Sequence, residues 1–469
     1  MIVETPSFAG LAGVARRDIT PPPGIRARNW GPATWDVAAG VHRPLTLSAL
    51  ALAAAGEEGA PAAGERPLVL IEADLGWWRG VDSEWALRSA LLEALDLPPE
   101  RLLFALSHTH AGPSTDLGDA DLDGGGEIAG YRGRLLAAAT EAAREAIGAL
   151  RPATIEWATG RCALAAEREL LREGRALVGF NPAGAADDTL LIGRIAAADE
   201  RRTPLGTLVN YACHPTTLAW QCRLISPDWP GAMRATVEAA TGAPCLFLQG
   251  ASGDLAPREQ YVGDVEVADR HGRAVAHAVL AALETLPPPG SALELSGVQE
   301  SGAPLALWEA VPHAGSRALA AERREVELAF RELPTLAQLA AEWAGIDPQS
   351  RDERLRRARA LRDGYVEGPT VRHPIWLWRI GDALLAAHPG EAFQWLQRTL
   401  RAELPERPLL VANLVNGPGF VYLPTQAAYD RGAYAAWQTP LAAGSLERLH
   451  AAMKEGLEAV GNVEKEIAR

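Results

Sequence analysis

Short apolar runs alternate with longer stretches of helical periodicity through residues 10–290 of the chain. The runs are four to seven residues long and rich in Leu, Val, Ile and Phe, which predicts buried β-strands. The predicted strands are 68–74, 102–106, 207–212 and 245–248. The longer stretches place Ala and Leu among charged residues, which predicts amphipathic helices. The predicted helices are 85–95, 131–150 and 264–286. This alternation favours an α/β fold.

The second part of the chain has a different pattern. The sequence Pro-Pro-Pro-Gly at 287–290 marks a candidate boundary, and residues 315–364 are dense in Ala, Leu, Arg and Glu, which predicts a mainly helical segment. From there to about residue 440 the chain returns to strands and loops. We therefore expect one large mixed α/β domain over residues 1–469, with 315–364 as a helical insertion that packs on it or covers its pocket.

Composition and charge exclude several classes of protein. A hydrophobic content of 48% and a charged content of 22% are those of an ordinary soluble globular protein. The net charge of −14 argues against nucleic acid as the main partner, although a local site for a small substrate can still be positive. The chain has no run of about 18 apolar residues, so we expect no membrane span, and its N-terminus lacks the pattern of a signal peptide. The four scattered cysteines favour reduced thiols in a cytoplasmic protein, which can be a monomer or a dimer.

Two histidines follow the predicted strand 102–106, in the sequence Ser-His-Thr-His-Ala-Gly-Pro. If the strand continues through them, His108 and His110 point to the same face, because side chains repeat every two residues along a strand. Two imidazoles at the end of a strand can begin a metal site. A hydrogen-bonded structural pair fits this motif equally well when it is taken alone.

Three further motifs also follow predicted strands. His214 precedes a proline and can be a metal ligand, although a histidine that caps a loop is the simpler interpretation. The glycines of 249–257 would let backbone N–H groups approach a ligand, or would only form a tight turn. Glu391, in His-Pro-Gly-Glu, can bind a metal or can be an acid at a helix N-terminus.

Together these motifs resemble the neutral/alkaline (non-lysosomal) ceramidase family, specifically its catalytic domain. The resemblance covers residues 11–440, nearly the whole chain. The segments that carry it are 13–22, 107–113, 210–215, 250–257, 389–391 and 422–425, with the tyrosines that follow the last.

The resemblance implies a zinc site. The family binds zinc through two histidines, a glutamate and a tyrosine, and these roles fall on His108, His214, Glu391 and Tyr422. Nitrogen and oxygen ligands with one position left for water are typical of catalytic zinc, and such a water can ionise near neutral pH. We therefore expect one Zn²⁺ per chain.

The choice of tyrosine depends on spacing. The ligand tyrosine of the family is followed by tyrosines seven and twelve positions later, and Tyr422, Tyr429 and Tyr434 reproduce that spacing. An offset alignment would put Phe420 at the ligand position, but phenylalanine cannot bind zinc.

The resemblance also implies residues that face the substrate. His110 matches a histidine beside the metal and would orient water or stabilise an oxyanion. Arg168 lies where the family has an Asn-Arg pair, but Glu167 replaces the asparagine. Tyr434 would hydrogen-bond the substrate or the intermediate.

One substrate motif departs from the family pattern. Gly-(Asn/Asp)-x-Ser-Pro is represented by Gly253, Asp254 and Ala256 of the sequence Gly-Asp-Leu-Ala-Pro, which we expect to bind substrate. Ala256 replaces a serine that contacts the substrate beside the zinc, and alanine cannot donate a hydrogen bond. The replacement implies a head group other than that of ceramide, or a contribution from Ser252. We also expect no C-terminal immunoglobulin-like domain of the kind that ceramidases typically carry.

The sequence therefore predicts a zinc-dependent hydrolase that cleaves the C–N bond of a small N-acyl compound through zinc-activated water. An ester or a lactone would be attacked in the same way. A ligand-binding, non-hydrolytic relative is the competing hypothesis, which Ala256 favours and the retained ligand set opposes.

Overall fold

An eight-stranded mixed sheet forms the centre of the molecule in this computed structural model, which describes residues 1–56, 60–62, 64–362, 364–418 and 421–462. The strand order is β14-β12-β11-β7-β2-β4-β5-β6. The pairs at the two ends, β5–β6 and β12–β14, are parallel, and the other pairs are antiparallel. The strands are β2 (Ser7–Asp18), β4 (Thr46–Ala53), β5 (Leu68–Ala73), β6 (Leu102–Leu106), β7 (Arg151–Arg161), β11 (Thr189–Ala197), β12 (Pro204–Tyr211) and β14 (Cys245–Gln249).

A second sheet fills the concave face of the first. Its order is β18-β19-β20-β22, and its last pair is parallel. Trp376 and Trp378 of this sheet lie in one apolar cluster with Leu103 and Leu248, which come from opposite ends of the large sheet. The large sheet therefore curls around the small one, and β14 contacts β5 and β6. The strands are β18 (Leu319–Ala329), β19 (Thr370–Ile380), β20 (Ala383–Ala387) and β22 (Leu409–Ala412).

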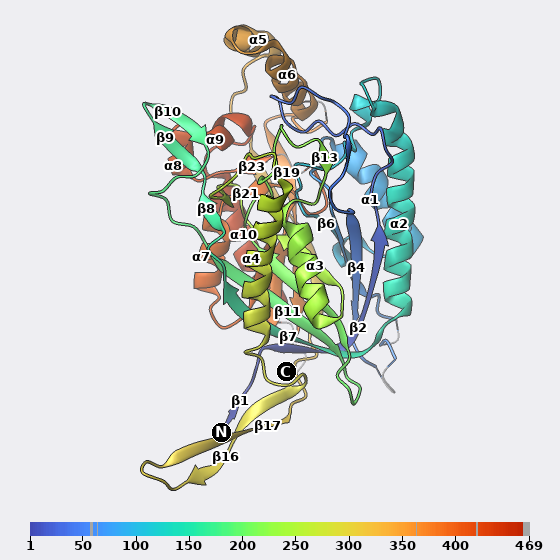
Figure 1. Cartoon of the computed structure of the whole chain (residues 1–469), viewed down its shortest axis with the longest axis vertical. Helices are drawn as coiled ribbons and strands as arrows, with labels where there is room; N and C mark the ends of the chain where they lie inside the picture. Colours follow the sequence, from blue (N-terminus) through green and yellow to red (C-terminus); the bar gives the residue numbers. More distant parts are fainter. Residues whose placement is uncertain (57–59, 63, 363, 419–420, 463–469) are drawn as a thin grey trace.

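Helices cover the outer faces of both sheets (Figure 1). One pair packs on β4, β5 and β6, a second pair on β11, β12 and β14, and a third on the small sheet. The pairs are α1 (Val81–Leu95) with α2 (Ile128–Gly148), α3 (Trp229–Thr241) with α4 (Val265–Leu283), and α7 (Trp395–Glu403) with α10 (Ser445–Gly461). The molecule thus has four layers, helices–sheet–sheet–helices, with the largest apolar clusters between them.

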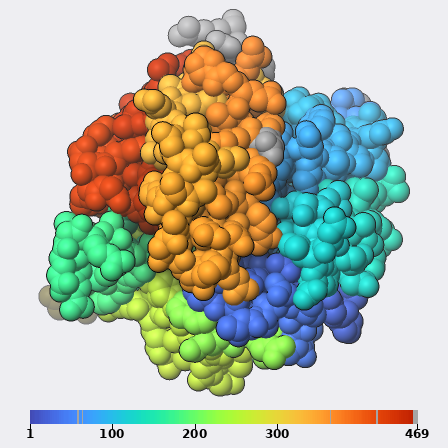
Figure 2. Space-filling view, turned by 90° about the horizontal axis from the view of Figure 1, so that it is seen from above, coloured from blue at the N-terminus to red at the C-terminus, as the bar shows by residue number. Residues whose placement is uncertain are grey.

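Two segments project from opposite ends of this body (Figure 1). At one end, β1 (Ile2–Val3), β16 (Ser291–Gln299) and β17 (Leu305–Pro312) form a three-stranded sheet. At the other end stand α5 (Leu336–Glu342), the single turn η5 (Trp343–Gly345) and α6 (Pro348–Arg362). Figure 2 shows this helical segment lying across the middle of the upper face.

Short elements complete the chain. Four two-stranded sheets among the described residues stand apart from the larger sheets. The pairs are β3 (Gly40–Val41) with β13 (Leu224–Ile225), β8 (Ala165–Glu167) with β15 (Leu255–Pro257), β9 (Glu169–Arg172) with β10 (Arg175–Val178), and β21 (Glu391–Ala392) with β23 (Tyr422–Leu423). The short helices are η2 (Pro99–Arg101), η3 (Leu117–Asp119), η4 (Gly125–Glu127), α8 (Gln426–Asp430) and α9 (Tyr434–Gln438).

The α/β prediction and each of the predicted elements before residue 287 are confirmed. β6 has the predicted bounds, and α4 begins one residue later than predicted because Asp264 caps it, accepting a hydrogen bond from the Glu266 N–H. Among the described residues we find no helix with the length and apolarity of a membrane span.

The prediction that 315–364 is mainly helical is wrong for its first part. Residues 319–329 form β18, which pairs along its whole length with β19. The strand contains many helix-forming residues, but Val326 and Leu328 are buried while Glu325 and Glu327 are exposed. This period of two matches a strand with one face on the core, so tertiary packing overrides helix propensity.

Close packing of α3 on α4 gives a test of the fold. A Cβ on Gly272 would lie 2.4 Å from the Trp229 carbonyl oxygen and 2.7 Å from the Met233 nitrogen. We expect Gly272→Ala to lower the free energy of unfolding by about 1–3 kcal/mol, because the backbone atoms of α3 cannot move away from the added methyl group without distorting the helix. Gly133→Ala is the matched control, since a Cβ added at Gly133 would have no atom of the described residues within 4 Å beyond the backbone of its own helix. This substitution should stabilise α2 by up to about 1 kcal/mol. Urea unfolding followed by circular dichroism measures both changes, and equal effects would contradict the packing.

Candidate functional site

Three loops that follow strands of parallel pairs meet at one place below α6. The loop after β6 carries His108, the loop after β12 carries His214, and the turn after β20 carries Glu391. The carboxyl ends of parallel strands are where α/β sheets commonly bind ligands. Because the large sheet is curled, the rings of His108 and His214 have centroids only 4.6 Å apart although they come from its opposite ends.

His108 and His110 converge through a turn and not through a strand. β6 ends at Leu106, and His108 has a φ of +68°, which is rare for a residue with a side chain. The strand therefore does not continue through the two histidines, so the condition for a same-face pair on a strand is not met. The turn nevertheless brings His110 Nε2 to 3.4 Å from His108 Nε2. The unusual backbone conformation is held by the His108 N–H, which donates to the Leu75 carbonyl oxygen at 2.9 Å.

Backbone carbonyls fix the orientation of two imidazoles. His108 Nδ1 donates to the Gly76 carbonyl oxygen at 3.0 Å, and His214 Nδ1 donates to that of Ser252 at 2.7 Å. A neutral imidazole with its proton on Nδ1 has a lone pair on Nε2. Carbonyl–histidine contacts of this kind orient the ligands of protein metal sites.

Both free nitrogens face the same carboxylate oxygen. Glu391 Oε2 lies 3.3 Å from His108 Nε2 and 3.0 Å from His214 Nε2, and all three side chains are buried. Two imidazole nitrogens and a carboxylate oxygen at these distances repel one another unless a proton or a cation lies between them. The donor set therefore fits a bound metal.

The titration of these groups agrees with metal binding. Burial, with the charge of Arg168, lowers the pKa of His214 to about 3. Burial also lowers the pKa of His110 well below 6.5. Although burial opposes its ionisation, the contacts with His108 hold the pKa of Glu391 well below 4.5. At neutral pH His214 and His110 are thus neutral and Glu391 is ionised, the states that bind metals.

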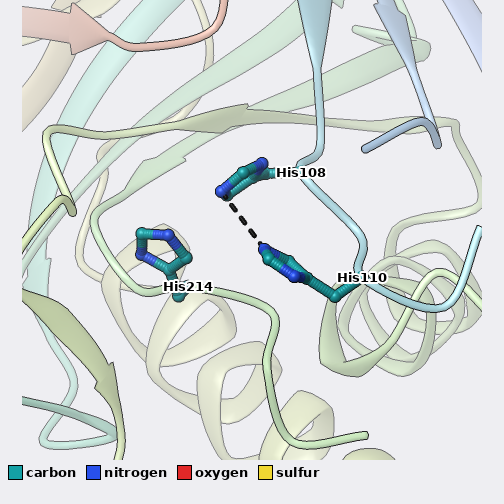
Figure 3. A group of neighbouring side chains, drawn as sticks. All are labelled: His108, His110 and His214. Atoms are coloured by element: carbon teal, nitrogen blue, oxygen red, sulfur yellow. Dashed lines mark hydrogen bonds between the residues drawn. The ribbon is translucent and has the colours of Figure 1, made fainter. Parts of the chain in front are cut away.

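The histidine cluster can hold a metal ion. His108, His110 and His214 each offer a ring nitrogen, and these atoms all lie within 4.8 Å of one another. Figure 3 shows the three rings around a common space, with His108 and His110 joined by the hydrogen-bond contact. The sequence-predicted pair and the separate His214 are therefore parts of one centre.

Tyr422 reaches the centre through strand pairing. It lies directly opposite Glu391 in the β21–β23 pair. Its hydroxyl accepts a hydrogen bond from Arg168 Nη2 at 3.2 Å, and the same nitrogen lies 3.2 Å from His214 Nε2. Burial raises the pKa of Tyr422 well above 10. The guanidinium of Arg168 thus links the tyrosine to the histidine.

The Gly253 motif positions Arg168. The carbonyl oxygen of Gly253 accepts hydrogen bonds from the guanidinium at 2.8 and 3.1 Å, and that of Asp254 accepts one from the Arg168 N–H. The Asp254 carboxylate accepts from the backbone and side chain of Gln394. Ala256 is fully buried in β15 opposite Ala166, away from the cavities that reach the histidines.

Two connected cavities open onto the centre. An inner cavity of about 60 Å³ is lined by His108, Glu391 and Tyr422, and an outer cavity of about 470 Å³ lies beneath α5 and α6. His110 and Tyr434 line both, so they lie where the two cavities join. Phe420, the alternative to Tyr422, lies outside the described residues.

Sequence reasoning missed residues on both sides of the centre. Arg79 and Arg357 line the inner cavity, and no local pattern distinguishes them from other arginines. Behind Glu391, His388 donates from Nε2 to Asn413 Oδ1 at 2.8 Å and accepts from His373 at 3.1 Å. His388 was visible as part of the Glu391 motif, but its partners come from distant strands.

Removal of one imidazole tests the centre. We expect His214→Ala to lower the metal content of the purified protein at least about tenfold, because a ligand is lost. His277→Ala is the matched control, since His277 is exposed on α4, and its metal content should equal that of the wild type. Elemental analysis after dialysis gives the measurement. Full metal content in a folded His214→Ala protein would exclude His214 as a ligand.

Comparisons with known proteins identify the fold. No protein-family model matches the chain, and neither does any curated protein. A solved structure described as a ceramidase complexed with C2 matches 99% of this chain and 76% of its own, with a TM-score of 0.65 and 15% identity. The neutral ceramidase from Pseudomonas aeruginosa matches 99% of this chain and 75% of its own, with a TM-score of 0.64 and 17% identity. The chain is thus a structural relative of the neutral ceramidases and has their fold over nearly its whole length.

Proposed function

We propose that this protein is a zinc-dependent hydrolase that cleaves the amide bond of an N-acyl compound. The observation that carries the proposal is the meeting of two imidazole lone pairs with the Glu391 carboxylate at a cavity. The shared fold supports the choice of bond, because its solved examples are described as ceramidases and ceramide is an N-acyl amide. Within the proposal the chain forms one catalytic domain, and its four free cysteines support a cytoplasmic location.

The proposed ligands are His108, His214, Glu391 and Tyr422, with one Zn²⁺ per chain. Imidazole nitrogen and oxygen donors suit zinc. When bound, zinc supplies a Lewis acid for the carbonyl and brings the pKa of a water toward 7. The raised pKa of Tyr422 means that its hydroxyl is protonated in the metal-free chain.

Proton transfer falls to His110. Burial keeps this imidazole neutral near pH 7, so it can accept a proton from the attacking water. It lines both cavities and can therefore pass that proton to the leaving nitrogen of an amide that spans them.

Tyr434 and Arg168 stabilise the negative charge that develops on the carbonyl oxygen. The Tyr434 side chain lines both cavities and can direct its hydroxyl at that oxygen. Arg168 places a positive charge beside the centre and holds Tyr422 and His214 in place. In this proposal Gly253, Asp254 and Ala256 serve the substrate indirectly, through the position of Arg168.

An assay on defined substrates tests the proposal. We expect the zinc-loaded protein to hydrolyse N-acyl amides and to lose activity when a chelator removes the metal, with recovery on addition of Zn²⁺. Fatty-acyl esters and lactones of the same chain length should be run in parallel to measure the preference for amides. A folded, zinc-loaded protein that cleaves none of the amides would contradict the proposed function.

Substitution of one hydroxyl tests the role of Tyr434. We expect Tyr434→Phe to lower kcat by roughly 10²–10³-fold with a small change in KM, because a donor to the developing oxyanion is removed. Zinc content should stay at the wild-type level. Tyr429→Phe is the matched control, because the Tyr429 hydroxyl donates to the Leu441 carbonyl oxygen, away from both cavities. Equal kcat values for the two variants would rule out the proposed role.

A further inference from the structure

Arginine side chains gather around the cavities of an acidic protein. The chain has a net charge of −14, yet five arginines and only three glutamates line the two cavities. The arginines are Arg79, Arg331, Arg354, Arg357 and Arg362, and the glutamates are Glu342, Glu353 and Glu391. The cavities are thus locally positive, which attracts anions.

Three of these arginines build the wall of the outer cavity. Arg331 and Arg362 donate to backbone carbonyl oxygens. The Arg354 guanidinium stacks on Trp343 and Trp437 at 5.7 and 5.4 Å from the ring centroids. Backbone carbonyl oxygens thus engage donors of Arg331 and Arg362, and two indole rings engage the face of Arg354.

Arg79 lines the inner cavity with its charge only partly balanced. Its Nη1 donates to Asp119 Oδ2 at 3.0 Å. The same carboxylate also faces Arg26 at 3.6 Å and Arg356 at 3.4 Å. Asp119 thus faces three guanidinium groups, of which Arg26 also pairs with Asp36 at 2.8 Å.

Arg357 is the second guanidinium of the inner cavity. Both of its hydrogen bonds to described residues use Nη2, which donates to Glu353 and to the Asn29 carbonyl oxygen. Nε and Nη1 have no hydrogen-bond partner among the described residues, so each can donate to a ligand. Arg79 and Arg357 line the same cavity, so their like charges repel each other. Burial lowers the pKa of Arg79, this repulsion adds to the effect, and Asp119 opposes both. An anion between them would relieve this repulsion.

From this arrangement we infer that the substrate is an N-acyl compound with a carboxylate on the amine side of the amide, such as an N-acyl amino acid. The carboxylate binds Arg79 and Arg357, and the acyl chain occupies the outer cavity. The inner cavity is much the smaller, whereas the outer one has walls of Trp30, Trp343 and Leu361 that suit a hydrocarbon chain. Addition of water across the C–N bond then releases a fatty acid and a free amino acid. This inference rests on the proposed function.

A pair of substrates that differ only in charge tests the inference. N-decanoylglycine and N-decanoylglycinamide have the same acyl chain and the same scissile bond. We expect the wild type to have at least a tenfold higher kcat/KM for the acid. Arg357→Gln should reduce this preference roughly 10- to 100-fold, the effect of losing a charged hydrogen bond. Arg357→Lys, which retains the charge, should keep part of the preference.

Arg359→Gln is the matched control, because Arg359 lies on the same helix, is exposed and lines neither cavity. It should leave the preference unchanged. Equal hydrolysis of the two substrates, or preference for glycinamide, would overturn the inference and leave the proposed amide hydrolase standing. A preference that survives Arg357→Gln would also overturn it.

Binding measurements keep the inference testable without turnover. If neither compound is cleaved, calorimetric titration of both into the wild type and Arg357→Gln separates the two proposals. Tighter binding of the acid that disappears in Arg357→Gln would support carboxylate recognition while the hydrolase proposal fails. Equal affinity for both compounds would overturn the recognition as well.

Discussion

Two imidazole nitrogens and a carboxylate oxygen face one another at a single buried point, an arrangement that suits a bound cation. Carbonyl oxygens of Gly76 and Ser252 hold the ring protons on the far nitrogens of His108 and His214. Pairing of β21 with β23 holds Glu391 in register with Tyr422. These contacts therefore keep the Nε2 atoms of the two histidines and the Glu391 carboxylate directed at one point.

The curled sheet is what makes such a centre possible. In a flat sheet the ends of β6 and β12 would lie six strand positions apart, and their histidines could not meet. Curling brings the ends together around the small sheet, which contributes Glu391 from its own parallel pair. The same arrangement leaves the face above the centre open, and α6 covers it with a side chain, Arg357, that lines both cavities.

The elements were more predictable than their arrangement. Strands such as 102–106 could be predicted because an apolar run is a local signal. β18 was missed because its many helix-forming residues outweighed a short alternation of Glu with Val and Leu at 325–328. His108 and His110 were paired for the wrong reason, since a turn with positive φ cannot be read from periodicity. His214, Glu391 and Tyr422 could be joined to them only through the family resemblance, because they are distant in sequence. Arg357 had no local signal, since its place depends on how α6 packs.

The curled sheet also determines when the centre can exist during folding. The side chains proposed as its ligands follow the two ends of one sheet and a strand of a second sheet that comes later in the chain. Each contact among them closes a long loop of the chain. The chain must therefore lose the conformational entropy of that loop before the contact can form. No partially folded segment can assemble the complete set of ligands. A metal ion could therefore bind the complete site only in the folded chain. A bound ion would stabilise the folded state and slow unfolding of the whole chain.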